Sequence, residues 1–157
     1  MKEYRVTKYN PNNRDSKGSY LAEEWSSISD VGKSVTKSEY EEIENAYIDS
    51  ALEFLKEQGI SHLRLEGIEN SLETDEPDIQ LNEGILLKES EIRIVMKSVL
   101  REKYWAKLVN KDTYIHFGYD YYMYVGTPNE PKNAIVSAES RGLFVEEFES
   151  PYNENEL

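Results

Sequence analysis

The chain of 157 residues contains no cysteine, which excludes disulfide bonds, thiolate metal sites and cysteine nucleophiles. It has no apolar run near the ~18–20 residues of a membrane span and no apolar signal segment at its start. Basic residues are scarce: 18 Lys and Arg stand against 31 Asp and Glu, for a net charge of −13. Such a chain repels phosphate backbones and anionic lipids. We therefore expect a cytoplasmic protein that binds neither nucleic acid nor membrane.

Recognisable catalytic motifs are also absent. The sequence has no Gly-rich phosphate loop, no dinucleotide fingerprint, no zinc-protease motif and no nucleophile elbow around its serines. The two histidines, His62 and His116, are far apart in the chain. We therefore predict no cofactor, no bound metal and no enzymatic activity.

The polar segment 10–18 carries part of a calcium-loop pattern. A lysine, Lys17, occupies one of its ligand positions, and a strand-like rather than helical segment precedes it. We therefore predict an ordinary polar turn, with a calcium site as the minor alternative. The matching positions of the pattern are Asn13, Asp15, Gly18 and Glu24.

The most distinctive stretch that is present runs from Thr113 to Gly126. It is rich in aromatic and β-branched residues, which suit the half-buried surface of a sheet. Small and polar residues at Gly118–Asp120 suit a tight reversal. The stretch predicts an antiparallel hairpin at the centre of the domain. Its aromatic residues are Tyr114, Phe117, Tyr119, Tyr121, Tyr122 and Tyr124.

Helical periodicity appears in three segments. Thr36 to Gln58 has a capping box formed by Thr36 and Glu39, an apolar stripe, and Gly59 as a natural stop. Lys88 to Lys103 has a second apolar stripe. A short third helix is expected from about Asn129, as its cap, to Ser140.

Strand-like segments precede, separate and follow these helices, which indicates an α+β fold. We predict a mostly antiparallel sheet of five to six strands, with two long helices and one short helix packed on it. Residues 1–157 are expected to form a single domain with a polar C-terminal tail from about residue 150. The expected strands lie at 2–9, 60–68, 79–81, 104–110, 113–126 as a hairpin, and 143–148.

The first long helix is strongly acidic on its polar side, whereas the second carries several basic residues. The acidic side has two interpretations, a solvated helix face or a surface complementary to a basic partner. On the second interpretation, the partner-binding candidates are Glu41, Glu42, Asp49 and Glu53 of the helix and Asp75, Glu76 and Asp78 of the loop after residue 69. Tyr121 and Tyr122 are candidate aromatic anchors, with a core position as the alternative.

A second candidate site uses the aromatic hairpin. Tyr114, His116, Asp120 and Tyr124 could line a pocket with an acid–base pair, as a small ligand-binding domain or enzyme would have. The alternative is a structural cluster on one face of the sheet. Spacing alone supplies no oriented nucleophile and base.

Three segments carry a resemblance. W-S-S-I-S-D-V-G at 25–32, H-F-G-Y-D-Y-Y-M-Y at 116–124 and G-L-F-V-E-E-F at 142–148 resemble a family of small bacterial proteins of unassigned activity. In size, acidity and lack of motifs the chain is also similar to the immunity proteins of bacterial polymorphic toxins. That second resemblance implies an inhibitor that binds and neutralises a basic toxin domain, for example a nuclease, by charge complementarity. It assigns no role to any particular residue.

Overall fold

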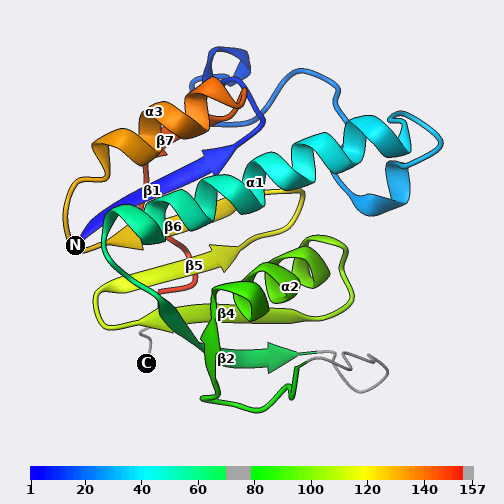
Figure 1. Ribbon diagram of the computed structural model, residues 1–157. Helices are drawn as coiled ribbons and strands as arrows, with labels where there is room; N and C mark the ends of the chain where they lie inside the picture. Colours follow the sequence, from blue (N-terminus) through cyan, green and yellow to red (C-terminus); the bar gives the residue numbers. More distant parts are fainter. Residues whose placement is uncertain (70–78, 154–157) are drawn as a thin grey trace.

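The computed structural model describes residues 1–69 and 79–153 and arranges them as one seven-stranded antiparallel sheet with three α-helices (Figure 1). The strands are β1 (Lys2–Thr7), β2 (His62–Glu69), β3 (Leu86–Lys88), β4 (Trp105–Asn110), β5 (Thr113–Phe117), β6 (Met123–Thr127) and β7 (Phe144–Glu147). The helices are α1 (Lys37–Glu57), α2 (Glu89–Leu100) and α3 (Lys132–Ser140), with 3₁₀ turns at Pro11–Asn13 and Ile28–Asp30.

The predicted α+β class and antiparallel pairing are confirmed, but five to six strands were too few. The three-residue β3 is too short to show alternation, and it runs directly into α2. The expected segment at 79–81 forms no strand. The polar segment at 10–18 is a turn in which the Asp15 side chain accepts hydrogen bonds from the Lys17 and Ser19 amides.

The strand order is β3-β2-β4-β5-β6-β1-β7. Strands β4, β5 and β6 form a meander, so the predicted aromatic hairpin is confirmed as β5 and β6. The first strand, β1, lies between β6 and β7, which places the first and last strands side by side at one edge of the sheet (Figure 1). Leu65, Leu108, Ile115, Val125 and Tyr4 are paired in register across five neighbouring strands.

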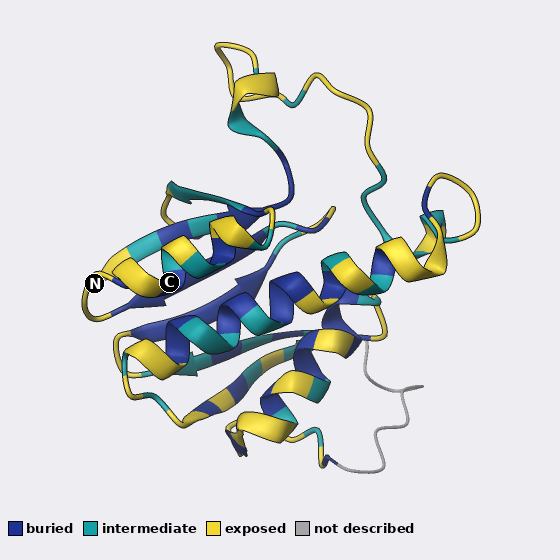
Figure 2. Cartoon of the chain, turned by 45° about the horizontal axis from the view of Figure 1, so that its top comes forward, coloured by how far each residue is buried: buried dark blue, intermediate teal, exposed yellow. Residues whose placement is uncertain are grey.

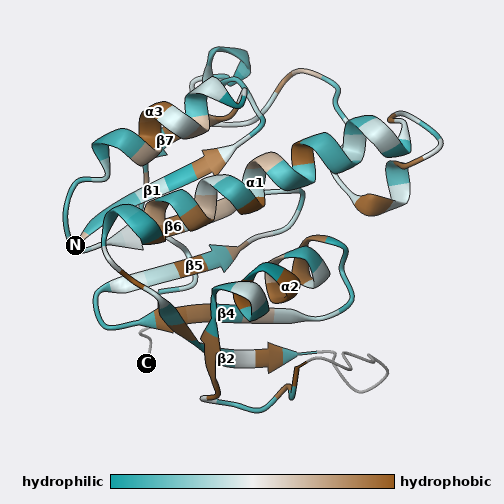
Figure 3. Ribbon diagram, in the orientation of Figure 1, coloured by the Kyte–Doolittle hydropathy of each residue, from teal (hydrophilic) through white to brown (hydrophobic). Residues whose placement is uncertain are grey.

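All three helices cover the face of the sheet to which that row belongs. The sides of α1 and α2 that face the sheet are buried and apolar, and their outer sides are exposed and polar (Figures 2 and 3). Phe54 of α1 and Val95 of α2 are fully buried there. The core therefore follows from two periodicities, alternation along the strands and the 3.6-residue repeat along the helices. None of the helices in the described ranges has the length and apolarity that crossing a membrane requires.

The opposite face of the sheet is covered in part by residues 148–153, which include the start of the polar tail expected from about residue 150. The Phe148 amide donates to the Glu3 carbonyl, Ser150 is buried against His116, and the Lys107 ammonium donates to the Tyr152 carbonyl. Asn153 donates to the Glu3 carboxylate at 2.7 Å. This C-terminal segment is an ordered layer because each of these polar contacts fixes it to a strand.

The three helices end in the same way, with one informative difference. In each, the second residue after the helix takes a left-handed conformation, and its amide and the amide of the next residue donate to carbonyls of the helix. Gly59 after α1 and Gly142 after α3 occupy that position, as expected for a conformation that favours glycine. After α2 the position is held by Glu102, at φ 63°.

The start of α3 also differs from expectation. Pro131, rather than Asn129, precedes the first turn. The Glu57 carboxylate, at the end of α1, accepts hydrogen bonds from the Asn133 and Ala134 amides at 3.2 and 2.7 Å. A carboxylate at a helix start is favourable because the free amides there carry partial positive charge. The cap comes from a distant helix, which local sequence cannot reveal.

Candidate functional site

Several carboxylates of the acidic helix α1 are paired with arginines of α2 and of its C-cap. The Arg93 guanidinium lies 2.9 Å from the Asp49 carboxylate. Arg101 binds the buried Glu44 carboxylate through two hydrogen bonds of 2.7 and 2.9 Å and lies 3.9 Å from Glu41. Part of the opposite charge of the two helices is therefore used in ion pairs between them.

The other acidic candidates divide into two groups. Glu42 is exposed and Glu53 half-exposed, and neither makes an ion pair within the part of the chain that the structure describes. Asp75, Glu76 and Asp78 lie outside the described residues. Of the four candidates on α1, only Glu42 and Glu53 present carboxylates that no described arginine or lysine neutralises.

The two anchor candidates are not exposed. Tyr121 is buried, with its ring edge-on to Trp25, Tyr40 and Tyr47 and its hydroxyl bonded to the Tyr40 hydroxyl. Tyr122 is half-buried. Tyr121 therefore belongs to the hydrophobic core, the alternative given from the sequence, whereas Tyr122 is outside the core cluster and has its ring against Tyr9 and Arg5.

The residues of the hairpin site are brought together only in part. His116 stacks on Tyr114 with 4.2 Å between ring centroids and lies opposite Tyr124, on the face covered by the C-terminal segment. It is 3% exposed, and its Nδ1 lies 2.8 Å from the Ser150 hydroxyl. Burial, with a smaller effect of the nearby Lys107 charge, lowers the pKa of His116 to about 3. It is therefore a neutral imidazole at physiological pH, bordering a small cavity of about 210 Å³.

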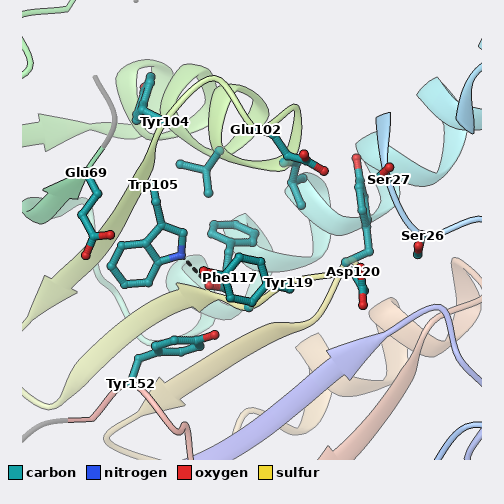
Figure 4. A pocket seen from close by; sticks show the side chains of 14 residues that line it. Ser26, Ser27, Glu69, Glu102, Tyr104, Trp105, Phe117, Tyr119, Asp120 and Tyr152 are labelled. Carbon is teal, nitrogen blue, oxygen red and sulfur yellow. Dashed lines mark hydrogen bonds between the residues drawn. The ribbon is translucent and has the colours of Figure 1, made fainter. Parts of the chain in front are cut away.

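Asp120 does not join this group. It lies in the β5–β6 turn and lines a different pocket, of about 590 Å³, at the end of the sheet. We call this the end pocket. It forms where the β5–β6 turn, the segment joining α2 to β4, the end of β2 and the C-terminal segment meet (Figures 1 and 4). Its volume is in the range of ligand-binding clefts.

The walls of the end pocket are aromatic. The Trp105 indole is oriented by a 2.7 Å hydrogen bond to the Phe117 carbonyl, and its ring lies 5.4 Å from that of Tyr152. Figure 4 shows these rings gathered with Tyr119 beside them. Tyr119 is 86% exposed, the most exposed large hydrophobic side chain among the described residues. Rings that offer their faces to an open pocket can stack on a flat or cationic group.

Among the residues that the structure describes, the charged side chains that line the end pocket are all acidic: Glu69, Glu102 and Asp120. In Figure 4, Glu69 and Glu102 lie on opposite sides of Trp105. Within the described ranges no three acidic or histidine side chains converge closely enough to hold a metal ion. Among the described residues the end pocket therefore combines negative charge with aromatic surface and offers no ligand shell for a metal ion.

The backbone around the end pocket is unusual and firmly held. Glu102, Asp120 and Tyr121 have φ values of 63, 61 and 64°, a left-handed conformation that costs a non-glycine residue about 1–2 kcal/mol. The Tyr9 hydroxyl donates to the Asp120 carbonyl at 2.5 Å, and the Tyr47 hydroxyl donates to the Tyr121 carbonyl at 2.8 Å. These buried hydroxyls fix the turn, so Tyr119 and Asp120 are presented from a rigid base.

Sequence reasoning did not find Glu69, Glu102, Trp105, Tyr119 or Tyr152 as site residues. They come from separate segments that only the fold brings together, so spacing gives no signal. One local signal existed: the second long helix has no glycine before the following strand, where the first helix has Gly59. A helix without a glycine stop can end on a residue that carries a side chain, as this one does at Glu102.

In comparisons with known proteins, no protein-family model, curated protein or solved structure matches the chain.

Proposed function

We propose that this protein is an inhibitor of the immunity type that binds a basic protein domain and neutralises it. The observation that supports the proposal is the end pocket, whose described lining has aromatic walls and three carboxylates but no lysine or arginine. It lies on a chain of net charge −13. A basic surface is the natural complement of such a site.

Two physical effects would act in sequence. The net negative charge attracts a basic partner over long distances and raises the association rate, an effect that salt screens. At contact, a few aromatic residues supply most of the binding energy, as is typical of protein interfaces. Tyr119 suits that role because it is exposed on a fixed turn.

The acidic helix has a smaller role in this proposal than its composition suggests. Asp49 and Glu44 are paired with arginines of α2, so their charges are largely used within the fold. Glu42 and Glu53 remain available for attraction. Glu42 lies near the start of α1, at the end of the molecule that carries the end pocket (Figure 1).

The first experiment asks what the chain binds. The purified protein is immobilised, exposed at low salt to lysate of the cells that produce it, and eluted with a salt gradient. We expect a basic protein that salt releases and whose own activity is lost when it rebinds. A neutral or acidic partner, or a complex that high salt leaves intact, overturns the proposal.

The second experiment uses two charge reversals of equal size. Glu42→Lys lies toward the end pocket, whereas Glu130→Lys lies in the loop at the opposite end of the sheet. Both change the net charge by two, so a difference between them reports position. We expect Glu42→Lys to slow association with the captured partner several-fold more than Glu130→Lys. Equal effects would show that only the total charge matters.

A further inference from the structure

We infer that the end pocket takes an arginine side chain of the partner, held between the aromatic walls and the Glu102 carboxylate. The inference rests on the proposed function, because it names the group that the basic partner inserts. It is more specific, since net charge alone would not distinguish arginine from lysine or place the contact at any one residue.

The walls favour a guanidinium group. Trp105 and Tyr152 lie 5.4 Å apart, tilted by 53°, and exposed Tyr119 stands at the rim. A guanidinium is planar and weakly hydrated, so it stacks on aromatic faces, whereas an ammonium is compact and strongly hydrated. Aromatic rings also attract a cation placed over their faces.

The carboxylates favour the same group. A carboxylate can accept two parallel hydrogen bonds from a guanidinium, which adds direction to charge attraction. Glu69, Glu102 and Asp120 all line the end pocket, and no lysine or arginine lining it competes for them. The protein itself shows the pairing a short distance away, where Arg101 binds Glu44 through two hydrogen bonds.

Glu102 is singled out by its backbone. It holds the left-handed position after α2 that Gly59 and Gly142 hold after α1 and α3. At those two glycines an added Cβ would meet no atom within 4 Å, so space alone does not exclude a side chain there. Glycine occupies this position after α1 and α3. After α2 the position is occupied by Glu102, whose backbone is strained there and whose side chain lines the end pocket. Strained residues of this kind concentrate at binding sites.

The test uses short peptides and an NMR signal from the end pocket. The probes are acetyl-Gly-Arg-Gly-amide, its lysine counterpart, and the citrulline counterpart, which has the same shape as arginine without the charge. The reporter is the indole N–H of Trp105. The sequence has two tryptophans, and Trp25 does not line the end pocket, so its indole serves as an internal control.

We expect the arginine peptide to shift the Trp105 signal saturably with a dissociation constant on the order of 1 mM, a value typical of a single small contact. The lysine peptide should bind several-fold more weakly and the citrulline peptide not at all. No shift with the arginine peptide, or an equal shift with citrulline, overturns the inference.

Two variants of Glu102 distinguish the effect of its side chain on peptide binding from the effect of its strained backbone on stability. Glu102→Gln should weaken the arginine peptide about 5- to 10-fold, the effect of losing a charge-assisted bond. Glu102→Gly should weaken it as much while raising the melting temperature by about 2–4 °C, because glycine relieves the strain. The matched control is Asp112→Gly, in the β4–β5 turn at φ 56°, which relieves similar strain away from the end pocket. It should leave peptide binding unchanged.

The two proposals can fail separately. If the captured partner is basic but Glu102→Gln binds it and the arginine peptide as the unaltered protein does, the arginine pocket is wrong and the inhibitor proposal stands. If the arginine peptide binds as expected but the captured partner is acidic or neutral, the inhibitor proposal is wrong. In that case the end pocket recognises arginine in another setting.

Discussion

The two faces of the sheet are held by different interactions. On the helix-covered face, apolar side chains such as Phe54 and Ile115 are fully buried. On the other face, Tyr114, His116 and Tyr124 lie under the C-terminal segment, and several polar contacts fix it. Apolar burial is insensitive to pH, whereas a face built on a buried imidazole is not. The free energy of unfolding should therefore depend on side-chain volume on the helix-covered face. On the other face it should depend on the protonation of His116 and on hydrogen bonding to the C-terminal segment.

The largest expected effect is on the helix-covered face. Phe54→Ala removes a fully buried ring from α1 and leaves a cavity between the helix and the sheet. We expect the free energy of unfolding to fall by about 3–5 kcal/mol, measured by urea denaturation. A loss below about 1 kcal/mol would mean that the core refills the space and is less rigidly packed than the burial indicates.

The next effect belongs to the other face and depends on pH. Burial lowers the pKa of His116 from 6.5 to about 3, so below pH 6.5 the unfolded chain binds a proton that the folded chain does not. The contribution of neutral His116 to the free energy of unfolding is fully present above pH 6.5. It is lost as the pH falls toward 3, at up to about 1.4 kcal/mol per pH unit.

Replacing His116 tests this directly. In His116→Gln, the decline of stability between pH 6 and pH 4 should be shallower than in the unaltered protein, by about 2–3 kcal/mol over the two units. The control is His62→Gln, because His62 is exposed on β2. If the two variants follow the same pH curve, His116 is not the titrating group.

A smaller effect is expected from Gly126→Ala in β6. A Cβ there would lie 2.3 Å from the Tyr114 ring, which is held by its stack on His116 and its hydroxyl bond to Glu3. We expect a loss of about 1–3 kcal/mol from overpacking. The double variant Tyr114→Ala, Gly126→Ala should lose less than the sum of the two single losses. Simple additivity would contradict the clash.

The smallest effect should come from Ser150→Ala. It removes the Ser150 hydroxyl, which bonds His116 Nδ1 at 2.8 Å and accepts from the Tyr152 amide at 3.1 Å. We expect about 1–2 kcal/mol of destabilisation, with faster amide hydrogen exchange in the C-terminal segment. Unchanged exchange at Tyr152 would show that other contacts suffice to hold the segment.

Local pattern predicted much of the fold. The capping box at Thr36 and Glu39 and the stop at Gly59 placed α1 nearly to the residue, and alternation placed the aromatic hairpin. These features depend on neighbours within a few positions. The order of the strands depends on long-range pairing, so the place of β1 between β6 and β7 could not be derived from its own residues.

The site was harder to predict for the same reason. Charge identified the acidic helix, but not that Arg93 and Arg101 would neutralise part of it. Tyr121 and Tyr119 look equivalent in the sequence, yet the left-handed turn between them buries one and exposes the other. Orientation in a turn is set by backbone conformation, and composition does not report it.

Tyr152 borders both the end pocket and the smaller cavity beside His116. Genes are often shortened when the last residues of a protein look dispensable. Ending this one after codon 149 would delete one aromatic wall of the end pocket and also uncover His116. A shortened protein prepared for crystallisation would then misreport both recognition and acid tolerance, so residues 150–153 should be kept in any version used for binding studies.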